Sequence, residues 1–274
     1  MSDSINRPVR AAKMDPATEL RRTVYELHAV LSALDTIQTP ELIRPDVPHG
    51  QPVTQELAYW SLRVYAYSIL SQFREMLRST LMLQDQGHVP AVFLCCRALF
   101  EMAAHAYYVK KHAFQHLDKK DYQAVWDFML GINQGSRYMR EKQKAGAFPH
   151  KTHEIEEGPH IAKIIACFNE YFLERGKKEA TENYSFLSEF CHPNSFAFTN
   201  HIEVEEPQTG VAARVTFSKP APETSIQVLP DALYSCMPLL FCMDELLIRM
   251  NDTGFDKACQ EFLRITEAGF QKAE

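Results

Sequence analysis

The sequence contains little glycine, and this scarcity limits the folds that it can form. Only 10 of its 274 residues are glycine. Turn-rich β folds use glycine where the backbone needs a positive φ, so a low glycine content favours long helices. Hydrophobic residues make up 46% of the chain, which is enough for a substantial core. We therefore expect a helical protein.

The chain also lacks an excess of positive charge. It carries 29 Lys and Arg against 35 Asp and Glu, a net charge of −6. Without an overall basic field there is nothing to collect nucleic acid at long range, so we expect no DNA partner. A local basic site for RNA is compatible with this balance.

Cysteine is present in a number and spacing that do not suit disulfides or zinc. The seven cysteines form no CxxC pair, and most lie in apolar helical contexts. Buried reduced thiols in a cytoplasmic protein are the expected state. The N-terminus has no apolar run typical of a secretory signal, and no uninterrupted apolar stretch reaches about 18 residues, so we expect no membrane span.

Several common motifs of catalysis and cofactor binding are absent. The sequence has no GxGxxG or GxxxxGK[ST] loop for phosphates, no HExxH and no GxSxG. His112 and His116 have the spacing of two metal ligands on a helix, but lysines surround them and a solvated face is the simpler interpretation. We expect no cofactor and no metal.

Hydrophobic residues at helical spacing predict an all-α bundle of seven to eight helices. Asp15 followed by Pro16 indicates an N-cap and a first turn, and Gly87 separates the second helix from the third. The expected helices span about residues 16–37, 54–84, 90–117, 120–141, 159–175, 177–192, 230–250 and 254–270.

Two segments have a different character from the helices. Residues 202–206 and 212–218 are rich in alternating or β-branched positions, with Pro-Gln-Thr-Gly between them, which predicts one inserted β-hairpin near 202–218. Residues 1–13 are polar and are predicted to be a disordered tail. The remainder, 14–274, is predicted to be a single helical domain.

A polar stripe follows one side of the apolar helix expected at 90–117. Arg97, Glu101 and His105 recur every four residues and lie within about 80° of one another on the helical wheel. Most other positions of this helix are apolar, which is typical of a central helix. The stripe is either a solvent face with a weak surface ion pair, or the wall of a cleft in which Arg97 holds an anion.

A second stripe lies on the helix expected to end near residue 192. Tyr184, Ser188 and His192 are also four residues apart, and Pro193 ends the helix. Ser188 is expected either to bond the carbonyl of Tyr184 locally, with His192 and Asn194 capping the helix, or to line a site in which His192 moves a proton beside Arg97.

The segments RALFEMAAHAYYV and NYSFLSEFCHPNS resemble a group of bacterial helical proteins with R-x-x-x-E and Y-x-x-L-S-x-x-x-H-P motifs, a group distantly similar to the HEPN superfamily. The resemblance covers roughly residues 55–200. It implies a HEPN-like helical core, a homodimer, and functional roles for Arg97, Glu101, Ser188 and His192.

Many HEPN proteins are metal-independent ribonucleases or toxins that use an Arg-x4–6-His motif. Seven residues separate Arg97 from His105, so His192 is the expected catalytic partner of Arg97 if the chain is such an endoribonuclease. Three functions follow as hypotheses. The first is a helical binding or assembly module, in a bacterial defence or stress system, with RNA or protein as partner and a pocket built from Arg97, Glu101 and His192. The second is the ribonuclease, and the third is a small-anion or small-molecule binding protein.

Overall fold

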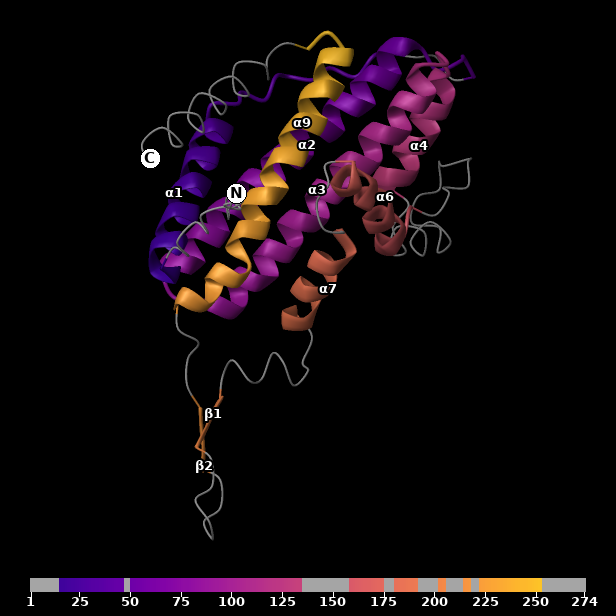
Figure 1. Ribbon diagram of the computed structural model, residues 1–274. Coiled ribbons are helices and arrows are strands. Elements are labelled where there is room, and N and C mark those ends of the chain that lie inside the picture. The colour runs from indigo at the N-terminus through magenta and orange to yellow at the C-terminus, as the bar shows by residue number, and fades with distance from the viewer. Residues whose placement is uncertain are drawn as a thin grey trace, which may run out of the picture.

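The computed structural model describes residues 15–46, 50–134, 158–174, 180–191, 202–205, 214–217 and 222–252. Within these ranges the protein is a bundle of α-helices, which confirms the predicted all-α helical fold (Figure 1). The helices are α1 (Pro16–Asp35), α2 (Gln55–Asp85), α3 (Val89–Leu117), α4 (Tyr122–Gln134), α6 (Ile161–Leu173), α7 (Ala180–Cys191) and α9 (Leu229–Arg249), with the 3-10 helix η1 (Pro222–Gln227) before α9.

The helices begin and end at residues that the sequence marks. The Asp15 carboxylate accepts a hydrogen bond from the Thr18 amide at 3.1 Å, which confirms the N-cap of α1. The Thr54 hydroxyl caps α2 in the same way, accepting from the Leu57 amide at 3.3 Å. Gly87 has φ of +69°, which lets the chain turn sharply between α2 and α3. The predicted helix at 254–270, the end of the one at 120–141, and the tail 1–13 lie outside the described residues.

Helix α3 is the centre of the bundle, and α2, α4, α6, α7 and α9 all pack against it. Its length and apolar composition are sufficient to cross a membrane, and half of its most apolar stretch is buried inside the fold. Ala103 and Ala106 are fully buried, so the neighbouring helices can approach its backbone closely. The central position of α3 therefore buries part of its apolar surface against the neighbouring helices.

Ion pairs join two outer helices to the C-terminal part of α3. Lys110 forms an ion pair with Glu245 of α9, and Lys111 forms one with Glu170 of α6. All four side chains are partly exposed, so these pairs orient the helices more than they stabilise them.

Two short strands follow α7 in the chain. Strands β1 (Ile202–Glu205) and β2 (Arg214–Phe217) pair antiparallel, with Ile202 opposite Phe217 and Glu205 opposite Arg214. The segment between them, 206–213, lies outside the described residues.

Candidate functional site

The two polar stripes meet where α7 packs on α3. The Nη2 of Arg97 donates a hydrogen bond to the Tyr184 hydroxyl at 3.0 Å. The same guanidinium carbon lies 5.2 Å from the centre of the Tyr184 ring, within range of a cation–π interaction. Arg97 therefore contacts both the hydroxyl and the ring of one tyrosine, and it links two helices that are far apart in the sequence.

Arg97 also forms the predicted ion pair along its own helix. Its Nε lies 2.9 Å from Oε1 of Glu101, and the two side chains are 24% and 33% exposed. The pair is therefore half-buried: it lies neither on an open solvent face nor in an enclosed cleft. Because a carboxylate already balances the guanidinium, a bound anion would have to compete with Glu101 for Arg97.

Ser188 makes the local contact that one of the two interpretations of its segment predicts. Its hydroxyl donates to the carbonyl of Tyr184 at 2.7 Å, one turn earlier in α7. This bond confirms the expected local pairing and directs the hydroxyl hydrogen into the helix backbone. Ser188 thus lies one helical turn after Tyr184, and its hydroxyl makes a hydrogen bond within α7 itself.

His105 faces a different neighbour from Arg97. Its Nδ1 is hydrogen-bonded to the Tyr65 hydroxyl of α2 at 2.8 Å, and the two rings lie 5.7 Å apart. Burial lowers the pKa of His105 below its usual value and raises that of Tyr65 well above its usual value. The structure therefore places His105 in the contact between α2 and α3, whereas Arg97 lies in the contact between α3 and α7.

Two predicted site residues, His192 and Asn194, lie outside the described residues. Helix α7 is described as far as Cys191, the residue that precedes His192. The pairing of Arg97 with His192 stays a prediction.

Leu94 completes the surface around this cluster, and the sequence reasoning did not assign it a role. It is 53% exposed although its helix is the most central in the bundle. Glu101 lies seven positions after Leu94, which places the two about 20° apart on the helical wheel. We call Leu94, Arg97, Glu101 and Tyr184 the α3–α7 surface. The signal for this residue in the sequence was a leucine on the polar side of an otherwise apolar helix.

The described part of the chain shows no candidate metal site. No three His, Cys, Asp or Glu side chains gather there closely enough to hold a metal ion. The rings of His112 and His116 instead lie 5.7 Å and 6.5 Å from the ring of Phe128.

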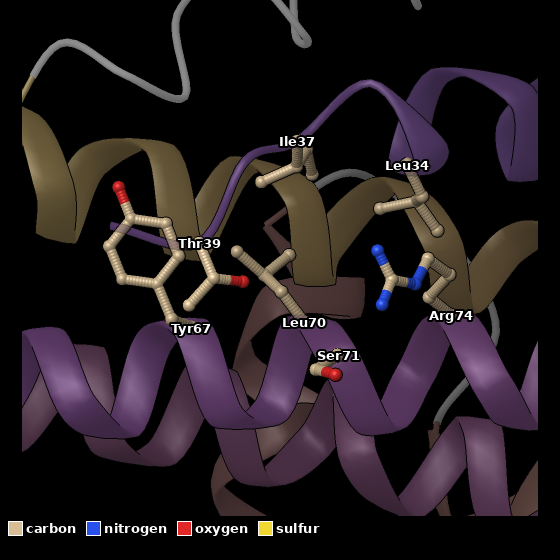
Figure 2. A pocket seen from close by; sticks show the side chains of 7 residues that line it. All are labelled: Leu34, Ile37, Thr39, Tyr67, Leu70, Ser71 and Arg74. Carbon is tan, nitrogen blue, oxygen red and sulfur yellow. The ribbon is translucent and has the colours of Figure 1, made fainter. Parts of the chain in front are cut away.

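An open hollow lies between α2 and the segment that follows α1 (Figure 2). Among the described residues, Arg74 is the only charged one that lines it, and its Nε is 3.4 Å from the Glu75 carboxylate and 3.9 Å from that of Asp35. The carboxylates of Glu75 and Asp35 already balance the charge of Arg74, so the hollow does not suit an anion. Its residues are Leu34, Ile37, Thr39, Tyr67, Leu70, Ser71 and Arg74.

Comparisons of the chain with models of known protein families, with curated proteins and with solved structures found no match. The geometry of the α3–α7 surface is therefore the basis for assigning a function.

Proposed function

We propose that this chain is a helical binding and assembly module that pairs with a second copy of itself through the α3–α7 surface. The observation that carries the proposal is an exposed leucine beside a half-buried arginine and tyrosine that are already bonded to each other. Tyrosine and arginine are enriched at the energetic centres of protein interfaces. Because they are held in place before binding, little conformational entropy remains to be lost.

The charges of this surface favour a partner that is not an anion. Arg97 and Glu101 together contribute no net charge, and the chain as a whole carries −6. An RNA phosphate would have to displace the Glu101 carboxylate and approach a negatively charged protein. A protein surface can instead pair with both charges at once.

A second copy of the chain suits this surface particularly well. In a two-fold symmetric interface the same patch faces itself, so it has to be complementary to itself. A cation and an anion one helical turn apart meet this condition, because antiparallel α3 helices bring Arg97 of one copy towards Glu101 of the other. Leu94 of both copies would then lose its exposed apolar area to the interface.

The ribonuclease hypothesis needs an imidazole beside Arg97 to move protons. His105 is engaged with Tyr65, so in this hypothesis the role falls to His192, which lies outside the described residues. The relation to the HEPN superfamily stays a prediction in the same way. We also infer that β1 and β2 are the arms of one inserted hairpin, which their antiparallel register supports.

A charge-exchange experiment tests the proposal. Arg97→Glu makes the surface acidic, with two carboxylates, and Glu101→Arg makes it basic, with two guanidinium groups. Each variant alone is expected to be mainly monomeric, because like charges face each other across the two-fold axis. An equimolar mixture is expected to form a heterodimer, measured by size-exclusion chromatography with light scattering at low salt.

Recovery of dimer in the mixture is a gain that a poorly folded variant cannot produce, so it separates the interface from a loss of stability. The proposal is contradicted if the mixture is no more dimeric than either variant, or if both variants dimerise as the wild type does. Cleavage of RNA by the wild type that is lost in His192→Ala would replace the assembly module with the ribonuclease.

A further inference from the structure

Both tryptophans of the chain lie against the same arginine. The guanidinium carbon of Arg44 is 5.8 Å from the centre of the Trp60 ring in α2 and 5.7 Å from that of Trp126 in α4. The composition confirms that the chain has only these two tryptophans. Arg44 belongs to the segment that follows α1, and its own side chain is exposed.

The two ring walls are held in place by contacts that do not involve Arg44. The Trp60 indole N–H donates to the carbonyl of Leu42 at 3.3 Å. Helix α4 is fixed to α2 by Tyr122, whose hydroxyl donates to the Gln55 side chain at 3.0 Å. The Tyr122 ring also packs edge-on against Tyr59, with centres 6.5 Å apart. Trp60 is therefore fixed by Leu42, and the helix that carries Trp126 is fixed to α2. We call the space between the two rings, which the Arg44 guanidinium occupies, the slot.

The chemistry of this slot selects a flat cation. An indole ring attracts positive charge more strongly than the other aromatic side chains, and the attraction extends to about 6 Å from the ring centre. A planar guanidinium can interact with two ring faces at once, whereas a lysine ammonium is a compact and strongly hydrated charge. Arg44 shows the geometry that a guanidinium takes there.

The Arg44 side chain can leave the two rings while its segment stays anchored to α2 through the Leu42 carbonyl. Residues 37–46 form no helix or strand, and Ile43 beside Arg44 is 79% exposed. Pro45 disfavours a helical conformation at Arg44, and no helical hydrogen bond restrains this residue. The contacts between the guanidinium and the two rings are thus a main restraint on this side chain.

We propose that the slot between Trp60 and Trp126 is a binding site for a guanidinium group, and that Arg44 occupies it until a ligand guanidinium replaces it. The site is separate from the α3–α7 surface and does not depend on the function proposed for that surface. An occupant from the same chain lowers the apparent affinity for a ligand by the fraction of time that the slot is empty. Removing Arg44 should therefore tighten binding by about 5- to 30-fold, the factor that corresponds to contact with the two rings.

Intrinsic tryptophan fluorescence reads the slot directly, since both fluorophores form its walls. The probes are N-acetyl-arginine methylamide, which represents an arginine within a protein, and methylguanidinium, which represents a small guanidinium compound. Each is titrated at constant ionic strength into wild type, Arg44→Ala and Ile43→Ala. Arg44→Ala should bind at least one probe about 5- to 30-fold more tightly than the wild type. Ile43→Ala, a change of the adjacent exposed residue, should match the wild type.

Tighter binding of the amide than of methylguanidinium identifies an arginine of a partner protein as the ligand, and equal binding identifies a free guanidinium compound. Arg44→Gln serves as a second variant, and far-UV circular dichroism checks that both variants are folded. The proposal is overturned if neither variant binds either probe more tightly than the wild type. It is also overturned if the gain persists when Trp126→Leu is added to Arg44→Ala, because the slot then has lost one wall.

Discussion

Replacing Tyr184 with phenylalanine removes one hydroxyl from the contact between α3 and α7 and leaves the aromatic ring in place. That hydroxyl accepts a hydrogen bond from the charged Nη2 of Arg97 at 3.0 Å. The ring beneath the guanidinium, at 5.2 Å, stays available for the cation–π interaction. The substitution therefore tests the hydrogen bond between the two helices separately from their packing.

The expected cost follows from the charge and the exposure of the donor. Hydrogen bonds to charged groups contribute roughly 1.5–3 kcal/mol when they are buried. Arg97 is 24% exposed, so water replaces part of the lost interaction. We expect Tyr184→Phe to lower the free energy of unfolding by about 1 kcal/mol.

The assay is urea unfolding at equilibrium, with amide hydrogen exchange of α7 as a local measurement. Tyr122→Phe is the matched control, because its hydroxyl also makes a 3.0 Å hydrogen bond between helices, but to the neutral side chain of Gln55. The control should cost about half as much, since charge-assisted hydrogen bonds are roughly twice as strong as neutral ones. Exchange should accelerate in α7 for Tyr184→Phe and stay unchanged there for the control.

A double-mutant cycle with Arg97→Met decides whether the two side chains act together. The coupling free energy should be about 1 kcal/mol, because Tyr184→Phe loses its effect once the donor is gone. Additive costs, with a coupling near zero, would refute the reasoning. The same conclusion follows if Tyr184→Phe leaves both the urea midpoint and α7 exchange unchanged.

Two further predictions concern the core. Burial lowers the pKa of His105, so the unfolded chain binds its proton more tightly than the folded protein does. The contribution of neutral His105 to stability is present above the unfolded pKa of about 6.5 and is lost as pH falls below that value. The decrease in the urea midpoint between about pH 7 and about pH 5 should therefore be smaller in His105→Gln than in the wild type. Ala103→Leu adds volume where α3 is fully buried, and it should lower the free energy of unfolding by about 1–3 kcal/mol, measured by the same urea titration.

Most of the helical architecture was predictable, because its signals are local. The N-cap at Asp15, the cap at Thr54 and the positive φ at Gly87 each depend on a few neighbouring residues. The spacing of apolar residues then gives the length of each helix to within a few positions. The central place of α3 was predictable from its nearly continuous apolar surface, which is typical of a helix surrounded by others.

The candidate site was predictable only in part, because its contacts join residues that are distant in the sequence. The helical wheel places Arg97, Glu101 and His105 on one side of α3, but it does not say which helix covers each of them. In the structure a turn of about 80° is enough to direct His105 to Tyr65 and Arg97 to Tyr184. The local contacts, from Arg97 to Glu101 and from Ser188 to the Tyr184 carbonyl, were the ones that spacing alone could predict.

Sedimentation equilibrium of the full chain tests most directly whether the α3–α7 surface assembles two copies. The wild type is predicted to show twice the 31.5 kDa mass of one chain. Leu94→Asp is predicted to be monomeric, whereas Ile248→Asp on α9 should stay dimeric, although both wild-type side chains are 53% exposed. A wild type that remains monomeric at high concentration, or a Leu94→Asp variant that dimerises as the wild type does, would contradict the account.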